Sequence, residues 1–128
     1  MKRVTGLGGI FFKVDDPARC KAWYRTHLGL EATDETGTSF RWRDPDAPDR
    51  SCITVWSPFP RGTNYFGPGA APFMINYRVA DLDALLAQLR KEGVKVEDKV
   101  EEMEFGRFGW ITDSEGNRVE LWEPAAGY

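Results

Sequence analysis

The feature that most constrains the fold of this 128-residue chain is an internal repeat. Each copy begins with an apolar strand, continues with a capped helix that a glycine ends, and closes on a strand with the ending Trp-x-Pro. Two unrelated stretches are not expected to share a strand, a cap, a glycine and an ending in the same order. The matching residues are 10–14 with 75–79, Asp16 with Asp81, Gly29 with Gly93 across one gap, and 54–58 with 120–124.

The first copy predicts a strand followed by a capped helix. Residues 9–14 are mostly apolar, and the polar pair before Pro17 interrupts the strand. Asp16 can cap a helix, and Pro17 suits its first turn, where no backbone hydrogen bond is lost. Gly29 ends the predicted helix, because glycine adopts the left-handed conformation at a helix end without strain. Within the predicted helix, residues with large or apolar side chains recur at helical spacing, namely Cys20, Trp23, Tyr24 and Leu28.

Shorter strands complete the first copy. We expect two of them around residues 30–32 and 39–43, and a third over residues 52–56. Residues 44–50 hold two prolines and three aspartates, which is typical of a turn or loop. Residues 57–72 contain four prolines and three glycines and form the one linker-like stretch of the chain. Because this stretch also carries Phe59, Tyr65 and Phe66, we expect it to pack over a surface.

The same pattern restarts after the linker. Residues 73–79 predict a strand, and Asp81 caps a helix that Gly93 ends. Leucines recur in this helix at positions i, i+3, i+4 and i+7, which predicts one apolar face. Further strands are expected at residues 94–96, 108–112 and 118–122, with a turn over 113–117.

These elements predict an α+β fold made of two βαβββ copies. The helix of each copy covers one face of its strands, so the other face needs a partner. Two copies can place their open faces around a shared pocket as mixed curved sheets, inside one chain or across a dimer. We predict a single domain over residues 1–128, with copy one at 6–58, a linker at 59–72 and copy two at 73–124.

The composition argues against several classes of protein. With 41% hydrophobic and 29% charged residues, the chain resembles ordinary globular proteins. A net charge of −3 with scattered Lys and Arg predicts no nucleic-acid partner. The apolar runs are too short for a membrane span, and the N-terminus lacks a signal-peptide pattern, so we expect a cytoplasmic protein. Cys20 and Cys52 have no metal-like spacing and are expected to be free thiols.

Two segments resemble the vicinal oxygen chelate superfamily, which includes glyoxalases, bleomycin-resistance proteins and extradiol dioxygenases. The first comprises Val14-Asp15-Asp16-Pro17, then Trp23-Tyr24 and Leu28-Gly29-Leu30. The second, residues 113–124, is similar to the family ending D-P-x-G-N-x-x-E-L with Ser114 in place of the proline. The resemblance covers nearly the whole chain and implies a small-molecule ligand and a homodimer. It does not single out one activity within the superfamily.

The resemblance also implies four positions that hold a divalent ion in metal-dependent members. Here they match Gly9, Thr54, Met74 and Glu120, and among them only Glu120 is a suitable ligand. Such a site needs about three nitrogen, oxygen or sulfur ligands from the protein. His27, the one histidine, is expected at the surface near the end of the first helix. We therefore expect no cofactor, unless other carboxylates or a dimer partner complete a divalent-metal site.

Strand alternation predicts which side chains face the pocket. Glu120 is the main polar member, because a carboxylate among apolar residues must be paired, hydrated or functional. Its structural partner would be Arg78 or Arg118 at the rim. If Glu120 is functional and desolvated, its pKa rises and it can act as a catalytic general base. The predicted lining is Phe11, Thr54, Trp56, Met74, Asn76, Glu120 and Trp122.

Residues 101–109 place charges beside aromatics and two glycines. One interpretation is a solvated edge. The other is a flexible flap over the pocket mouth, in which Glu102, Glu104 or Arg107 reaches the ligand and the glycines permit movement.

Three functions are compatible with these features. The first is a binding protein whose aromatic pocket takes up a planar or cationic small molecule, as bleomycin-resistance proteins do. The second is a lyase or isomerase that uses Glu120 as its base, with or without a metal. The third is a scaffold domain without a ligand. The unsuitable metal positions argue against a glyoxalase I or an extradiol dioxygenase, but they do not separate binding from metal-free catalysis.

Overall fold

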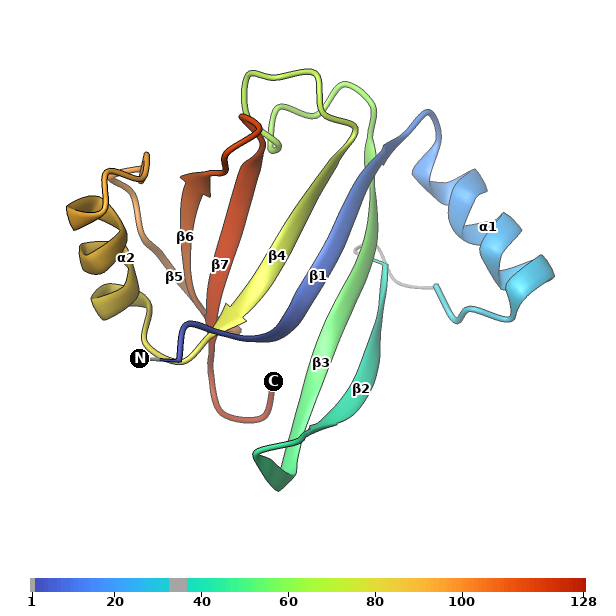
Figure 1. Ribbon diagram of the computed structural model, residues 1–128. Helices are drawn as coiled ribbons and strands as arrows, with labels where there is room; N and C mark the ends of the chain where they lie inside the picture. The colour runs from blue at the N-terminus through green and yellow to red at the C-terminus, as the bar shows by residue number, and fades with distance from the viewer. Residues whose placement is uncertain (1, 33–36) are drawn as a thin grey trace.

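The computed structural model describes residues 2–32 and 37–128, and these residues form two helices and seven strands (Figure 1). The first half contains β1 (Val4–Val14), α1 (Pro17–Leu28), β2 (Thr38–Asp44) and β3 (Ala47–Pro60). The second half contains β4 (Phe73–Val79), α2 (Leu82–Lys91), β5 (Glu101–Met103), β6 (Gly106–Thr112) and β7 (Arg118–Pro124).

All seven strands belong to one curved sheet in the order β2-β3-β1-β4-β7-β6-β5. The first strands of the two copies, β1 and β4, lie antiparallel at its centre, with Gly9 opposite Asn76 and Ile10 opposite Ile75. Each of them is parallel to the last strand of its own copy, β1 to β3 and β4 to β7. The predicted α+β fold with mixed pairing and two related copies is therefore confirmed, and the seam between the copies lies at the centre of the sheet.

Both helices begin at the predicted aspartates. The Asp16 carboxylate accepts a hydrogen bond from the Arg19 amide, and the Asp81 carboxylate accepts one from Ala84, each at 3.1 Å. The left-handed conformation of Gly29, with φ +66°, ends α1. These caps confirm the helix boundaries that the sequence predicts at both starts and at the end of α1.

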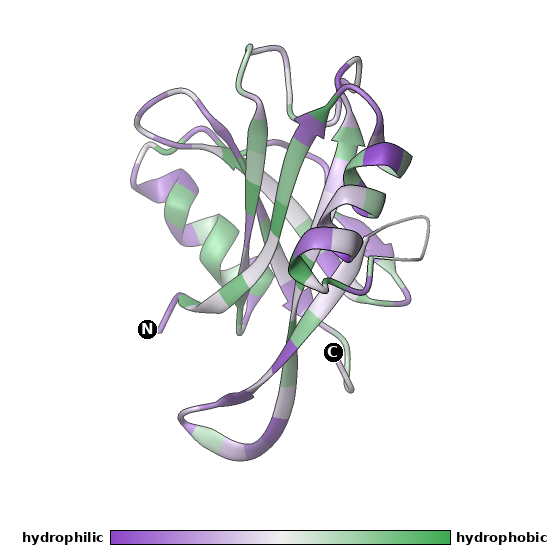
Figure 2. Cartoon of the chain, turned by 90° about the vertical axis from the view of Figure 1, so that its right-hand side faces the viewer, coloured by the Kyte–Doolittle hydropathy of each residue, from purple (hydrophilic) through white to green (hydrophobic). Residues whose placement is uncertain are grey.

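The two helices lie on opposite sides of the molecule (Figure 1). The leucine face of α2 packs on β4, β6 and β7, and Leu82, Leu85 and Leu86 are buried there. In Figure 2 the hydrophobic residues follow the central strands, whereas hydrophilic residues gather at the tip of the β2–β3 hairpin. Among the described residues, neither helix has the length and apolar character needed to cross a membrane.

Two predictions about short segments are wrong. Residues 30–32 form no strand, because Leu30 donates its amide back to the Tyr24 carbonyl and the chain turns at the helix end. Residues 94–96 contribute only an isolated bridge from Val96 to Ile111, and the strand β5 comes later. Runs of three apolar residues carry too little pattern to distinguish a strand from irregular structure.

The turn or loop predicted for residues 44–50 is present but shorter than expected. The turn takes up only residues 45 and 46, and β3 already begins at Ala47. Pro48 is tolerated there because β3 pairs with β2 alone over this stretch and reaches β1 only from Val55 onward. A proline needs no hydrogen-bond partner on the unpaired side of a strand.

The linker packs down on the molecule, as its aromatic residues predict. Phe66 is buried with Phe11, Met74 and Trp110 in a small core that is separate from the leucine core. The Tyr65 ring stacks on the Phe59 ring at 5.6 Å between centroids. The linker therefore covers part of one face of the sheet.

Candidate functional site

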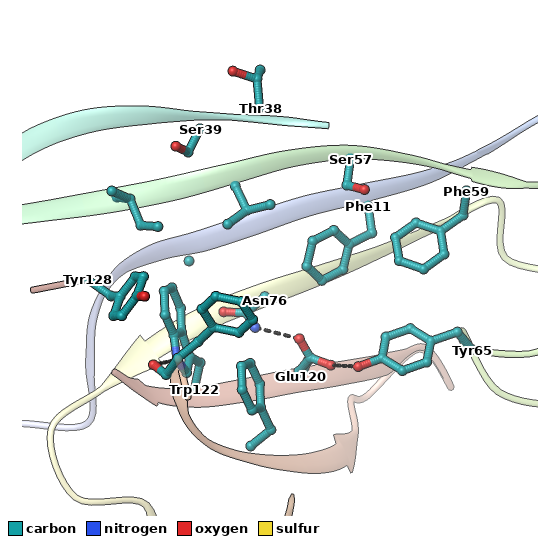
Figure 3. A pocket seen from close by; sticks show the side chains of 15 residues that line it. Phe11, Thr38, Ser39, Ser57, Phe59, Tyr65, Asn76, Glu120, Trp122 and Tyr128 are labelled. Atoms are coloured by element: carbon teal, nitrogen blue, oxygen red, sulfur yellow. Dashed lines mark hydrogen bonds between the residues drawn. The ribbon is translucent and has the colours of Figure 1, made fainter. Parts of the chain in front are cut away.

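A cavity of about 410 Å³ lies against the sheet where the two copies meet (Figure 3). Its walls are mainly aromatic and aliphatic, as in many small-molecule sites. Glu120 is the one carboxylate among the described residues that line it. Hydroxyl groups of Thr38, Ser39 and Ser57 lie on the side opposite Glu120. The aromatic lining comprises Phe11, Phe59, Tyr65, Phe105, Phe108, Trp122 and Tyr128.

Three side chains donate hydrogen bonds to the Glu120 carboxylate. The Asn76 amide nitrogen donates to Oε1 at 2.6 Å, and the Trp110 indole nitrogen donates to Oε2 at 2.9 Å. The Tyr65 hydroxyl also donates to Oε2. Glu120 is only 2% exposed, so these donors replace the water that an ionised carboxylate would otherwise bind.

Burial is the dominant influence on how Glu120 titrates. Loss of solvent raises the pKa of Glu120, while the hydrogen bonds from Tyr65, Asn76 and Trp110 act in the opposite direction. Burial and the neighbouring Glu120 charge raise the pKa of Tyr65 as well. The Tyr65 hydroxyl therefore stays protonated, and Glu120 is the group that changes its charge.

The sheet register explains why these groups meet. Asn76 lies beside Glu120 in the parallel pair of β4 and β7, and Trp110 lies beside it in the antiparallel pair of β6 and β7. Tyr65 arrives from the linker, 55 residues away in sequence. The sequence prediction missed Trp110 and Tyr65 as partners of Glu120. The alternation of side chains along residues 108–112 would have placed Trp110 on the face of the cavity. The position of Tyr65 follows only from how the linker packs.

Gly8 makes room for this network. A Cβ atom at position 8 would lie 2.0 Å from Asn76 Oδ1 and 3.1 Å from the Trp122 ring. Asn76 Oδ1 is itself buried and has no hydrogen-bond partner among the residues that the structure describes. The amide therefore takes the orientation that brings its nitrogen to Glu120, and the absence of a side chain at Gly8 leaves space for its oxygen.

Comparison with known proteins assigns the fold to a family. The model of the Glyoxalase/Bleomycin resistance protein/Dioxygenase superfamily matches residues 6–121. The chain belongs to this superfamily. No curated protein matches the chain.

Solved structures support the superfamily fold. A methylmalonyl-CoA epimerase variant from Streptomyces coelicolor, in complex with 2-nitronate-propionyl-CoA, is similar with a TM-score of 0.71 and 20% identity, over 96% of this chain and 99% of that one. The methylmalonyl-CoA epimerase from Mycobacterium tuberculosis is similar with a TM-score of 0.62 and 25% identity, over 98% and 91% of the two chains. A structure described as an NAD-dependent benzaldehyde dehydrogenase from Legionella pneumophila has a TM-score of 0.57 and 14% identity, over 91% and 98%. The likeness shows a shared fold.

The four metal positions expected of the superfamily are not direct neighbours in the sheet. Asn76, not Met74, lies beside Glu120, and the matching pair in the first copy is Phe11 with Ser57. Gly9 and Thr54 are therefore not the counterparts of this pair. The alignment of the Trp-x-Pro endings misses the difference because it fixes sequence position and not strand pairing.

The side chains that do meet are a poor set for a divalent ion. Phe11, Ser57, Asn76 and Glu120 offer one carboxylate, one amide oxygen, one hydroxyl and one hydrocarbon ring. The three donors on the Glu120 carboxylate compete with an ion for its lone pairs. Within residues 2–32 and 37–128, no group of three or more His, Cys, Asp or Glu is arranged to hold a metal.

Of the residues that the sequence analysis placed in the pocket, Phe11, Asn76, Glu120 and Trp122 line the cavity, whereas Thr54, Trp56 and Met74 do not. Trp56 packs against Phe12 and Tyr24, with ring centroids 5.2 and 4.9 Å apart. Thr54 donates to the Leu7 carbonyl at 2.6 Å. The prediction chose the wrong alternate residues of β3, and those facing the cavity are Ile53, Val55, Ser57 and Phe59.

Met74 is also misplaced in the prediction, since it is fully buried and packs with Phe11 in the small core. The predicted flap residues lie outside the cavity too. Arg107 donates two hydrogen bonds to Asp83 of α2, at 2.8 and 2.9 Å, and one to Glu102. The neighbouring rings of Phe105 and Phe108 line the cavity instead.

Neither arginine expected beside Glu120 is hydrogen-bonded to it. Arg118 forms a two-point ion pair with Glu97 and donates to the Tyr65 carbonyl at 2.5 Å. Arg118 thereby fixes the linker that carries Tyr65. Arg78 lies in a second cavity, between the rings of Trp42 and Trp122.

Proposed function

We propose that this protein binds a planar organic molecule, cationic or rich in hydrogen-bond donors, in the aromatic cavity and without the divalent ion of its metal-dependent relatives. The observation that carries the proposal is the direction of the hydrogen bonds around Glu120. Tyr65, Asn76 and Trp110 all donate inward to the carboxylate. The Trp122 indole is likewise engaged, with the Phe105 carbonyl at 3.0 Å.

A ligand that reaches this wall therefore meets lone pairs and negative charge. The Tyr65 oxygen keeps its lone pairs while its hydrogen points at Glu120, and among the described residues Glu120 Oε1 accepts one hydrogen bond, from Asn76. An N–H or O–H group of a ligand can bind these acceptors, whereas a carboxylate is repelled by the Glu120 charge. The surrounding aromatic rings favour a planar or cationic group over an aliphatic one.

Three small probes of one shape test the ligand class. Benzamidine, benzamide and benzoate differ chiefly in charge, and their binding can be followed by calorimetry. We expect the affinity to fall in that order in the wild type. Glu120→Gln should reduce the preference for benzamidine over benzoate by about tenfold or more, because it removes the charge and leaves the shape nearly unchanged.

Glu102→Gln is the matched control, because it changes the same chemical group on an exposed strand outside the cavity. It should leave the order and the affinities as they are. Equal binding of benzoate and benzamidine, or an unchanged preference in Glu120→Gln, would contradict the proposal. Binding that requires added Zn²⁺, Ni²⁺, Mn²⁺ or Fe²⁺ would contradict its metal-free part.

The second candidate is a metal-free isomerase in which Glu120 is the general base. Burial raises the pKa of Glu120, which suits proton transfer near neutral pH. Two of the similar structures are epimerases, which supports a search for this type of reaction. A base is distinguished from a binding group by its kinetics. Glu120→Gln would abolish turnover of a carbon acid while the ligand still binds. In the wild type, the rate of turnover would decrease at pH values below the pKa of Glu120.

We also propose that the protein is a cytoplasmic homodimer. Large apolar side chains remain exposed outside the cavity, including Ile10, Trp23 and Leu28. Such exposure supports a protein interface. Native mass spectrometry of the purified protein would give the mass of a dimer, and a monomer at all accessible concentrations would overturn this part.

A further inference from the structure

The Ser57 side chain is a buried polar group at the aromatic cavity. Ser57 lines the cavity from β3 and is only 6% exposed. Within residues 2–32 and 37–128, its hydroxyl forms no hydrogen bond. The Ser57 oxygen is open to the cavity, in contrast to the closed-off Oδ1 atom of Asn76. A buried hydroxyl without a partner is costly, so a ligand group that bonds to it gains affinity.

The sheet register places a second hydroxyl on the same face of the sheet. Ser39 of β2 lies opposite Val55 of β3, two residues before Ser57. Residues two apart in a strand point to the same face, so Val55 and Ser57 both line the cavity, and Ser39 lines it from the next strand. Figure 3 shows these hydroxyls along β2 and β3, across the cavity from Glu120. The first copy therefore presents hydroxyl groups to the polar network of the second copy.

The two sides of the cavity offer opposite hydrogen-bonding chemistry. Around Glu120, three donors point at the carboxylate, which leaves acceptors for a ligand. Each hydroxyl on the other side carries a hydrogen that it can donate to a ligand. Among the described residues that line the cavity, none is Lys, Arg or His. The hydroxyl side therefore suits an uncharged acceptor, such as a carbonyl oxygen, better than an anion.

The distance between the two sides sets the length of the ligand. The strands β4 and β1 lie between β7, which carries Glu120, and β3, which carries Ser57. Three strand spacings of about 4.8 Å separate β7 from β3, which is about 14 Å along the sheet and less across its curve. A planar ring with a polar group at each end spans more of this distance than a ring with one polar group does.

We propose that the ligand has two polar ends. One end is a cationic or N–H-bearing group that binds Glu120, and the other is an uncharged carbonyl oxygen that accepts a hydrogen bond from Ser57. This inference rests on the proposed function, because it starts from a donor group at Glu120. It adds the orientation of the ligand and the chemistry of its second end, where Ser57 contacts the ligand and determines specificity.

Two probes of nearly the same shape test the second end. Para-acetylbenzamidine carries a carbonyl oxygen where para-isopropylbenzamidine carries a methyl group, and calorimetry gives the affinity of each. We expect the wild type to bind the acetyl probe more tightly. Ser57→Ala should reduce the ratio of the two affinities by about fivefold or more, which corresponds to the loss of one hydrogen bond. Ser39→Ala should reduce the ratio less, because Ser39 is exposed to water.

Ser51→Ala is the matched control, because Ser51 lies on the same strand outside this cavity. It should leave the ratio unchanged. The ¹H–¹⁵N signal of the Trp110 indole, which donates to Glu120, should shift with both probes, because both have the same amidine end.

Two results separate this inference from the proposed function. The inference alone is wrong if benzamidine is still preferred over benzoate, but the wild type binds the acetyl and isopropyl probes equally or Ser57→Ala leaves their ratio unchanged. If benzamidine is not preferred over benzoate, the proposed function fails and this inference fails with it.

Discussion

Both copies begin with a strand and a capped helix, and in the described residues two strands follow α1 whereas three follow α2. The copies also differ in how their helices pack. In α2, Leu82, Leu85 and Leu86 are buried against the sheet. In α1 only Lys21 is buried, while Trp23 is 53% exposed and Leu28 is 66% exposed. A repeated pattern of strands and caps therefore fixes where a helix lies in the chain, and the spacing of its apolar residues decides how much it contributes to the core.

The copies also divide the chemistry of the cavity between them. The second copy supplies Asn76, Trp110 and Glu120, which form the polar network. The first copy supplies apolar walls and the hydroxyls of Thr38, Ser39 and Ser57. In it Phe11 and Ser57 take the places that Asn76 and Glu120 take in the second. Two copies of one fold can therefore carry different side chains at matching positions of the cavity.

The largest expected difference between the copies lies in their helices. Leu82→Ala should lower the free energy of unfolding by about 2–5 kcal/mol, because it leaves a cavity in a closed core. Leu28→Ala should change it by less than about 0.5 kcal/mol, because this side chain is mostly in solvent. Urea unfolding of both variants measures the difference. Similar losses would mean that α1 has a hidden partner surface, such as a second copy of the chain.

The next largest effect concerns the polar network. Glu120→Met should destabilise the protein by about 2–4 kcal/mol, since it leaves the donors of Asn76, Trp110 and Tyr65 without an acceptor. Ser57→Ala, at the matching place in the first copy, should cost less than about 1 kcal/mol, because within residues 2–32 and 37–128 the Ser57 hydroxyl makes no hydrogen bond to a buried side chain. Equal effects in thermal or urea unfolding would show that the two copies do not divide the roles as described.

A smaller effect is expected at Gly8. Gly8→Ala would press a methyl group against the Asn76 amide and the Trp122 ring, and should cost about 1–3 kcal/mol. It should also weaken binding in the aromatic cavity, because the amide must move away from Glu120. Gly62→Ala is the control, since nothing lies within 4 Å of a Cβ there. Unchanged binding and stability in Gly8→Ala would contradict the claim that the absence of a side chain at Gly8 leaves space for the Asn76 amide.

The smallest effect concerns an ion pair that joins the copies at the surface. Arg3, just before β1, donates to Glu92 at the end of α2, and with Gln88 it lowers the pKa of Glu92 to about 2. A depressed pKa gives a contribution that is present above the ordinary value near 4.5 and is lost as the pH falls toward 2. Arg3→Gln should move the pKa of Glu92 back toward 4.5, as followed by NMR titration. The pKa of Asp83, which Arg107 lowers, should not move.

Much of the fold could be predicted because its signals are local. Asp16 and Asp81 cap helices through contacts three residues away, and the leucines of α2 show their face within two turns. The predictions of short strands at residues 30–32 and 94–96 failed, because three residues are too few to show a strand pattern. Trp56 was assigned to the wrong face because a shift of one residue in a strand reverses every side chain.

By itself the sequence determined the two related copies, the superfamily and the presence of one carboxylate, Glu120, on an apolar strand, since such a carboxylate is visible without coordinates. Only the tertiary structure decided what surrounds that carboxylate. Tyr65 comes from the linker, Trp110 from β6, and Phe11 with Ser57 replaces the pair that the alignment suggested. The physical reason is that strand pairing and linker packing join residues far apart in the chain, and neither leaves a periodic trace in the sequence.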